Sequence, residues 1–426
     1  MGKNGRGRYV SALWEPAFAR PGRKGDAGRY RAFVPDPVGD FEPQLSAATS
    51  ALSERAGAAV RELNASGAEL LPLEGLGRQL LRSEALASSA IEGLQLSHRR
   101  LARAEVEGKA GDFLAQEVLG NARAMEAAVG IGREARDLDV DDVRAIHRAL
   151  AIAPPLDRIA GQIRESQGWI GGASPLHAAF VPPPHDRLPA LMSDLCDFMN
   201  RDDVSPVAQA AIAHAQFETI HPFGDGNGRV GRCLVHVLFE RRGIAPRYVP
   251  PVSLVLGADK DAYIAGLEDF RADEVDRWVA QFARAVEDAT EHAKAFSADV
   301  AGLQAKWIRR AEPMRADSTA RAIVGHLPSY PIVTAAIVEK LTGRSRVAAI
   351  NGLDHLARAG ILTRRRNQRK GDSWEAKELF SLLDRFEEPV AVPHGNLLDH
   401  VEAVDRPPAG PPFSDEILDE LREERL

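Results

Sequence analysis

Twelve consecutive residues near the middle of the chain combine the side chains that phosphate chemistry needs. The stretch reads His-Pro-Phe-Gly-Asp-Gly-Asn-Gly-Arg-Val-Gly-Arg and runs from position 221 to position 232. His221 can take a proton from a hydroxyl group near neutral pH. Asp225 offers a hard carboxylate oxygen, which Mg²⁺ accepts together with substrate phosphates. The stretch therefore predicts a site that holds a polyphosphate and does chemistry on it.

The Gly-Asn-Gly segment of this stretch is suited to holding an anion. Gly226, Asn227 and Gly228 can adopt turn conformations that bulkier residues avoid, and such a turn directs backbone N–H groups toward one point. A helix that starts directly after the turn adds the positive end of its dipole. Arg229 and Arg232 are three apart on that helix, so they share a face and can grip phosphate oxygens.

Taken singly, each of these residues also fits an ordinary helical turn with a surface histidine, but the complete string does not. It resembles the signature of Fic-domain enzymes, His-Pro-Phe-x-Asp/Glu-Gly-Asn-Gly-Arg-x-x-Arg, at every fixed position. The lead-in at positions 214–220 is similar as well. The resemblance implies transfer of AMP from ATP to a hydroxyl side chain of a target protein, the chain itself included, with release of pyrophosphate.

The resemblance also implies a role for each residue of the motif. His221 is the base, and Asp225 carries Mg²⁺. The glycines hold the inner phosphates and the arginines the outer ones. The residues that it assigns to ATP binding are Gly226, Asn227, Gly228, Arg229, Val230, Gly231 and Arg232.

The sequence also bears on the type of reaction and on the nucleotide that serves as donor. A related branch that phosphorylates its targets has Lys where this chain has Gly228, which disfavours a kinase. UTP or GTP stays open as the donor, because an anion site reads phosphates and not bases. Family members contact the base from the segment after the motif, so Tyr263 is expected to line the adenine pocket. Asp259 stands where the family often has Asn, which leaves this contact open.

An upstream segment, Ser-Ser-Ala-Ile-Glu-Gly at positions 88–93, resembles the family's inhibitory helix, Ser/Thr-x-x-x-Glu-Gly/Asn. Ser88 and Glu92 are four apart and share one helical face. The resemblance implies that Glu92 pairs with Arg232 and takes the place of the γ-phosphate. A solvated charge at a helix end is the simpler alternative. In a further alternative, a de-AMPylase, Glu92 orients a water that removes AMP from a modified protein.

Residues 161–184 differ in amino-acid composition from the helical segments around them. They are rich in Gly and Pro and contain β-type residues, which predicts a hairpin-like loop. The stretch resembles the family's flap, which aligns the target segment by main-chain pairing; a plain surface hairpin is the alternative. The residues assigned to target docking are Trp169, Ile170, Gly171 and Gly172.

Hydrophobic periodicity predicts a mainly α fold. The resemblance implies that it consists of a Fic-type helical core with a β-hairpin flap, and the order of elements adds a C-terminal winged helix-turn-helix. The expected divisions are an irregular N-terminal arm (1–40), a helical region with the inhibitory helix (41–130), the catalytic core (131–300), the winged-helix domain (316–385) and a flexible acidic tail (390–426). Within the core, helices are expected over residues 188–200, 205–220 and 229–242.

The C-terminal unit is expected to contain helices over 320–327, 333–341 and 346–359, then a strand, a basic turn at 364–370 and a second strand at 374–379. This order is that of a winged helix, which can bind DNA or RNA. A protein-interaction or dimerisation module fits the pattern equally, so DNA binding and a homodimer both stay open. A nucleotide-sensing, DNA-binding regulator is the alternative function that follows from this unit.

Composition limits the setting in which the protein works. The chain has 426 residues and a formal net charge of -7, which argues against a chain-wide nucleic-acid surface. No stretch approaches the about 18 apolar residues of a membrane span. Cys196 and Cys233 lie in apolar segments, so buried free thiols and a cytoplasmic location are expected.

Overall fold

Two helices with almost no exposed face lie at the centre of the molecule. The computed structural model describes residues 5–15, 27–66, 73–108, 112–315, 317–366 and 371–388. Every residue of α7 (Pro206–Ile220) after its proline is buried, and α8 (Asn227–Arg241) is nearly as enclosed. A helix that is apolar on all sides must be covered on all sides. The two helices pack on each other and carry the twelve-residue motif between them.

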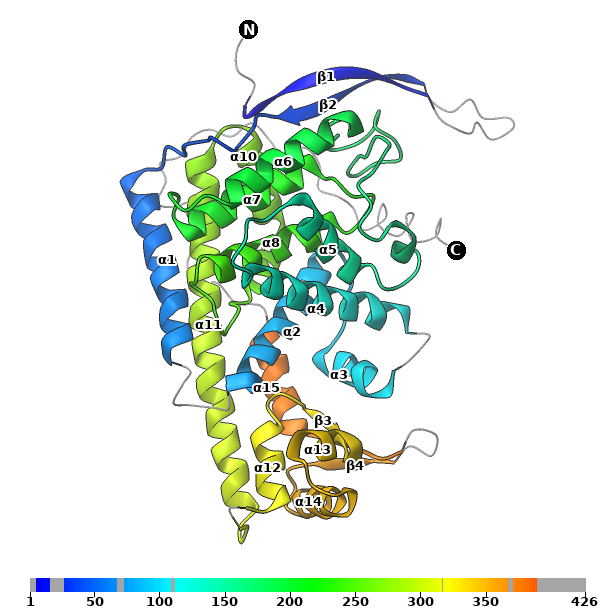
Figure 1. The fold of residues 1–426 in the computed structure, drawn as a ribbon, viewed down its shortest axis with the longest axis vertical. Coiled ribbons are helices and arrows are strands. Elements are labelled where there is room, and N and C mark those ends of the chain that lie inside the picture. Colours follow the sequence, from blue (N-terminus) through cyan, green and yellow to red (C-terminus); the bar gives the residue numbers. More distant parts are fainter. Residues whose placement is uncertain are drawn as a thin grey trace, which may run out of the picture.

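The other helices surround this pair and make the protein mainly α (Figure 1). The long helix α11 (Val275–Arg310) runs from α7 to the C-terminal unit. Shorter helices cover the remaining sides: α1 (Ala47–Ser66), α2 (Leu73–Ile91), α3 (His98–Glu107), α4 (Phe113–Gly132), α5 (Val140–Leu150), α6 (Leu188–Met199), α9 (Val252–Ala258) and α10 (Lys260–Arg271).

Local sequence explains where these helices begin and end. Asp139 and Asp142 form a reciprocal capping box at the start of α5. Proline is the first residue of α7 and the second of α6, where its missing N–H costs no helical bond. The helices predicted over 188–200 and 205–220 are therefore found within a residue of their expected ends.

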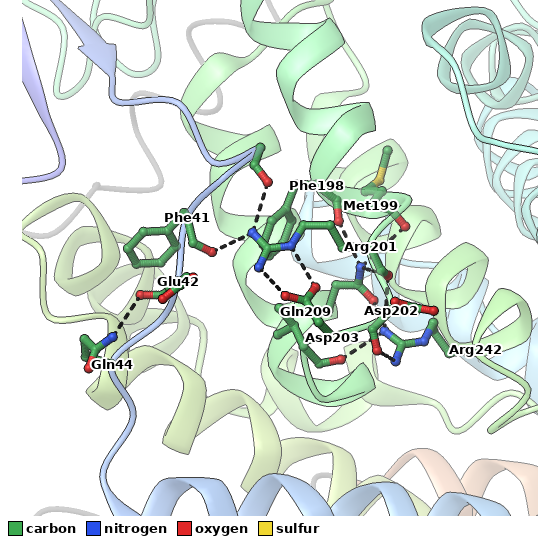
Figure 2. A network of polar contacts seen from close by, with 12 residues as sticks. Phe41, Glu42, Gln44, Phe198, Met199, Arg201, Asp202, Asp203, Gln209 and Arg242 are labelled. Atoms are coloured by element: carbon green, nitrogen blue, oxygen red, sulfur yellow. Dashed lines mark hydrogen bonds and ion pairs between the residues drawn. The ribbon is translucent and has the colours of Figure 1, made fainter.

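A polar network joins the ends of α6 and α8 to the segment that follows the N-terminal strands (Figure 2). Arg201 donates to the carbonyl oxygens of Gly39 and Phe41, at 3.0 and 2.8 Å. Arg242 donates to Gln209 Oε1 at 2.6 Å, and the Gln209 amide donates in turn to Arg201 O at 2.8 Å. Buried backbone carbonyls of these loops thereby gain partners, which fixes the loops on the helical core.

The N-terminal region is not an irregular arm, and that expectation is wrong. Strands β1 (Gly7–Trp14) and β2 (Gly28–Pro35) pair antiparallel over their full length. The Gly- and Arg-rich composition masks an alternation in which Tyr30 and Ala32 face inward. Phe33 N–H donates to Val181 O at 2.8 Å, so the hairpin packs directly on the segment expected to be the flap.

The flap itself is a loop and not a regular hairpin. Its strands are reduced to one bridge between Ile170 and Phe180. Gly171 and Gly172 both have positive φ angles, and the three prolines at 182–184 have no N–H to donate. A longer ladder is therefore lost, and the tip is closed instead by a bond from Trp169 Nε1 to Gly172 O at 3.1 Å.

The C-terminal unit contains four helices and one small antiparallel sheet in the order β3-β5-β4. Strand β3 and helix α15 were not expected, and the second predicted strand ends at Glu375 because Lys377 already begins α15. Its assignment as a winged helix stays a prediction, and the tail at 390–426 lies outside the described residues. The elements are α12 (Thr319–His326), β3 (Ile332–Thr334), α13 (Ala335–Thr342), α14 (Arg346–Arg358), β4 (Thr363–Arg365), β5 (Ser373–Glu375) and α15 (Lys377–Glu387).

The C-terminal unit packs on α2, the helix that carries the inhibitory-type segment. Leu76 and Leu80 of α2 belong to the same buried apolar cluster as the C-terminal helices. Gln79 donates to Pro328 O at 2.7 Å, and Arg82 donates to Ser329 O at 3.1 Å. No helix in the described part of the chain is long and apolar enough to cross a membrane.

Replacing Arg82 by Ala should loosen α2 as well as destabilise the protein. The change leaves the Glu105 carboxylate and the Ser329 carbonyl without this donor, a loss of about 2–3 kcal/mol. Denaturant titration gives the free energy of unfolding, and hydrogen exchange reports on the amides of α2. Arg55→Ala is the control, because its pair with Glu287 is exposed and contributes about 0–1 kcal/mol. Equal losses for the two variants would contradict the account.

Candidate active site

His221 lies at the point where α7 stops. It adopts a left-handed conformation, with φ 50° and ψ 61°, and its N–H still donates to Phe217 O at 2.8 Å. This conformation is rare for a residue with a side chain and turns the chain sharply out of the helix. The imidazole is consequently held at the mouth of the motif and not along the flank of α7.

A side-chain amide closes the loop that follows His221. Phe223 N–H donates to Asn227 Oδ1 at 2.8 Å, and Asn227 Nδ2 donates back to Phe223 O at 2.9 Å. The turn expected over three residues is a single left-handed residue, Gly226, with φ 79°. Asn227 and Gly228 already belong to α8, because the Asn227 side-chain amide bonds the Phe223 main chain from within the first helical turn.

His147 also holds this loop, and sequence analysis did not identify it. Gly161 N–H donates to His147 Nδ1 at 2.8 Å, so Nε2 carries the proton and donates to Asp225 O at 3.1 Å. The ring stacks on Phe223 with centroids 4.0 Å apart. Burial lowers the pKa of His147 to about 4, which keeps the ring neutral. One histidine on an amphipathic helix carries no signal for this long-range contact.

The start of α8 has the features of an anion site. Its first backbone N–H groups have no partner within the helix. Arg229 is only 4% exposed, and its Nε and Nη1 atoms have no hydrogen-bond partner among the described residues. Its Nη2 lies 3.8 Å from Asp225 Oδ1. Buried donors normally have partners, so these free N–H groups fit phosphate oxygens. Val230, by contrast, points into the core.

Asp225 fits Mg²⁺ bound mainly through a phosphate ligand. Its side chain is 38% exposed, and one carboxylate oxygen accepts from Gly226 N–H at 2.5 Å. Within the described ranges, no group of three or more His, Cys, Asp and Glu side chains could hold a metal ion. One carboxylate completed by phosphate oxygens and water is, however, a common arrangement for Mg²⁺.

Arg232 is bound to the C-terminal end of α2. Its Nη2 donates to Glu92 Oε1 at 2.7 Å and to Ser88 O at 2.9 Å, and its Nε donates to Ser88 Oγ at 2.9 Å. Burial favours the neutral guanidine, but the Glu92 carboxylate outweighs it and raises the pKa of Arg232. Burial likewise opposes ionisation of Glu92, and Arg232 outweighs it and lowers the pKa of Glu92. Both groups are therefore charged.

The Glu92 carboxylate also lies against the main chain of α8. A Cβ atom built on Gly228 would be 2.1 Å from Glu92 Oε1 and 3.1 Å from Arg232 Nη1. A carboxylate thus lies beside the first turn of α8, next to the donors of Arg229. Any larger residue at position 228 would collide with it, which explains the need for glycine there.

The first residues of the flap segment hold His221 from the other side. Arg164 Nε donates to His221 O at 2.9 Å, and Arg164 Nη2 donates to Pro183 O at 2.6 Å. Burial and the charge of Arg164 lower the pKa of His221 to about 4. The imidazole is neutral at neutral pH and can accept a proton. Trp169, next in the flap, packs edge-on against Trp14 of β1 and so ties the flap to the hairpin.

Tyr263 does not line an open pocket, contrary to expectation. It is 4% exposed, and its hydroxyl lies 2.7 Å from His214 Nε2. Its ring packs near Trp278 in the core. Asp259 instead caps α10 by accepting from Ala262 N–H at 2.9 Å. The aromatic residue is drawn inward because its hydroxyl finds a buried partner.

The geometry defines a class of protein: a helical protein with a neutral histidine beside an anion site at a helix start. Sequence comparison agrees with this class. The model of the Fic/DOC family matches residues 137–239, and that of the Fic/DOC family N-terminal region matches residues 50–130. Residues 50–130 and 137–239 of the chain are thus similar to the two regions of the Fic/DOC family.

The relatives that match include named enzymes. Protein adenylyltransferase fic-1 of Caenorhabditis elegans is 30% identical over 145 residues, which are 33% of this chain and 27% of that protein. Protein adenylyltransferase Fic of Drosophila willistoni is 33% identical over 152 residues, 35% of this chain and 28% of that protein. The matched part thus spans under a third of these relatives.

Two solved structures resemble the fold. A Fic family protein from Desulfovibrio desulfuricans G20 is 24% identical, with a TM-score of 0.49, and the match covers 79% of this chain and 98% of that chain. Fic-1 from C. elegans is 23% identical, with a TM-score of 0.46 and coverage of 58% and 73%.

Replacing Gly228 by Ala should push the Glu92 carboxylate away from Arg232. We expect a loss of about 1–3 kcal/mol in the free energy of unfolding, because a buried charged hydrogen bond is broken. In the Glu92→Gly background the clash is gone, so the second change should add almost nothing. Gly130→Ala is the control, since a Cβ there meets open space. Strictly additive losses would show that residues 228 and 92 do not interact.

Proposed function

We propose that the protein is an autoinhibited protein adenylyltransferase. It transfers AMP from ATP to a Ser, Thr or Tyr hydroxyl of another protein or of itself, and releases pyrophosphate. The observation that carries this proposal is the contrast between two arginines on one turn of α8. Arg229 has free buried N–H donors, while Arg232 is bound by Glu92 and Ser88.

The proposed substrate complex uses the first turns of α8. The triphosphate binds the N–H groups at its start and the two arginines, which suit phosphate oxygens better than lysine would. The residues that contribute main-chain or side-chain donors are Gly226, Asn227, Gly228, Arg229, Val230, Gly231 and Arg232. Asp225 holds Mg²⁺, whose charge offsets that of the phosphates.

In this proposal the reaction begins with His221. Its imidazole takes the proton of the acceptor hydroxyl, whose oxygen forms a bond to the α-phosphorus. The bond from that phosphorus to the bridging oxygen breaks, and pyrophosphate leaves. The lowered pKa of His221 keeps the ring unprotonated at neutral pH, so a ring nitrogen is available to the acceptor proton.

The contact between α2 and α8 supports autoinhibition. Glu92 places a carboxylate where Arg232 would meet the outer phosphate, so the phosphate chain cannot extend fully along α8. Bound ATP would then present its α-phosphorus out of line with His221, and in-line geometry is what transfer requires. Ser88 adds two hydrogen bonds that keep the Arg232 guanidinium turned toward α2.

The flap is the proposed docking segment for the acceptor protein. Trp169, Ile170, Gly171 and Gly172 lie near the end of the loop that Arg164 fixes beside His221. Most of the main chain of this segment makes no ladder, which leaves donors and acceptors for an added strand. Two buried free thiols, Cys196 and Cys233, support the cytoplasm as the site of action.

The proposed division of the chain has the inhibitory region before residue 131, the catalytic core at 131–300 and a winged-helix domain at 316–385. Two arginines of the predicted basic turn at 364–370, Arg364 and Arg365, do not support nucleic-acid binding by that domain. Arg364 is paired with Asp372 and Asp354, and Arg365 is paired with Glu107 of α3. These arginines would have to leave their partners before they could contact phosphates.

Labelled ATP tests the proposal. With Mg²⁺ and α-labelled ATP, Glu92→Gly should label itself at least about 10-fold more strongly than wild type, because Arg232 becomes free for the outer phosphate. His221→Ala in the same background should label at background level. γ-labelled ATP should leave no label on the protein.

Two results would contradict this proposal. Equal labelling of wild type and Glu92→Gly would remove the autoinhibitory role of Glu92, and label from the γ-phosphate would point to a kinase.

Chelation of Mg²⁺ by EDTA should abolish labelling, as should Asp225→Ala. Removal of AMP from a labelled protein by wild type, and not by Glu92→Gly, would identify the de-AMPylase instead.

A further inference from the structure

A buried carboxyl group lies behind His221 and has no role in the function proposed above. Glu218 is one helical turn before His221 on α7, and its side chain is about 10% exposed. Its Oε2 is 4.0 Å from His221 Nδ1, and its Oε1 has no hydrogen-bond partner among the described residues. Burying a carboxyl oxygen without a hydrogen-bond partner costs free energy, so its presence in the site calls for an explanation.

The main chain of α8 makes room for this carboxyl group. A Cβ atom built on Gly231 would lie 2.3 Å from Glu218 Oε1. Alanine at position 231 would therefore push Glu218 off His221. Gly231 thus leaves space for the carboxyl group of Glu218, just as Gly228 leaves space for the carboxylate of Glu92.

The charges around this pair come from several elements. The groups that face Glu218 or His221 are His214 on α7, Arg232 on α8, Glu92 on α2, Tyr263 and Arg271 on α10, Arg164 at the start of the flap segment, and Asp225 in the motif. Glu218 is the ionisable group beside Nδ1 of His221. The other ring nitrogen, Nε2, is the one that would take the proton of the acceptor hydroxyl.

We propose that Glu218 is a positioning residue whose carboxylate, 4.0 Å from Nδ1, stabilises the imidazole of His221 when it becomes protonated. The inference rests on the proposed AMP transfer. The proton of the acceptor hydroxyl moves to His221 Nε2, the ring becomes positively charged, and the Glu218 carboxylate beside Nδ1 offsets that charge. In serine hydrolases an Asp stabilises the catalytic imidazolium through a hydrogen bond to Nδ1; Glu218, at 4.0 Å, would do so through its charge.

Ionisation of Glu218 gives the proposal a pH dependence. Burial raises the pKa of Glu218 to about 7, above the usual range for a carboxyl group. A raised pKa means that the carboxylate exists only above about pH 7 and is neutral below it. The basicity of His221 should therefore rise as the pH passes through about 7.

The kinetic test compares Glu218→Gln with its parent, both in the Glu92→Gly background, using α-labelled ATP. The parent rate should rise through about pH 7. Glu218→Gln should lose this rise and be about 10- to 100-fold slower at pH 8, with KM for ATP within about 2-fold. Glu218→Asp should keep part of the pH-dependent rise. Thr219→Val is the control, since that hydroxyl bonds only to Ala215 O within α7. An unchanged pH profile in Glu218→Gln overturns the proposal.

A second measurement does not depend on catalysis. In ¹⁵N-histidine spectra, the His221 signal, identified by its loss in His221→Ala, should show a step near pH 7. That step should vanish in Glu218→Gln. If the step is identical in both proteins, the pair does not exist. If the step behaves as expected but no variant transfers AMP, the proposed function fails while the Glu218–His221 pair stands.

Discussion

The structure depends on how one buried guanidinium is satisfied. Arg232 lies inside the protein, where an unpaired charge would cost several kcal/mol, and Glu92 with Ser88 supplies its partners. The same pairing draws the end of α2 onto the first turn of α8. Gly228 permits this close approach, because any side chain there would meet the Glu92 carboxylate. The anion site and the C-terminal end of α2 therefore form one unit.

Helix α2 is fastened along its whole length and not only at Glu92. In its middle, Glu84 Oε1 lies 3.0 Å from His236 Nε2 of α8, and Ser253 N–H of α9 donates to Glu84 Oε2 at 2.8 Å. Nearer its start, Arg82 binds the C-terminal unit. A movement that frees Arg232 must strain or break these contacts. Helix α2 thus contacts both the C-terminal unit and the anion site.

Much of the site could be predicted from sequence, because its chemistry lies in one short string and its helices carry strong apolar patterns. The pairing of Glu92 with Arg232 was expected from the six-residue resemblance at positions 88–93 alone. Long-range contacts could not be predicted. His147 reaches the loop across 78 positions, and Gly-rich composition hid the pairing of β1 with β2. The inward turn of Tyr263 depends on a partner from α7, which no local pattern specifies.

The central claim is that Arg232 cannot bind the outer phosphate while Glu92 holds it. Crystal structures of the ATP–Mg²⁺ complexes of wild type and Glu92→Gly test this claim most directly. The account predicts that in wild type the bond between Arg232 Nη2 and Glu92 persists and the γ-phosphate lies elsewhere. In Glu92→Gly the γ-phosphate should contact Arg232, with the α-phosphorus in line with His221. A γ-phosphate on Arg232 in wild type, beside an intact Glu92 pair, would contradict the account.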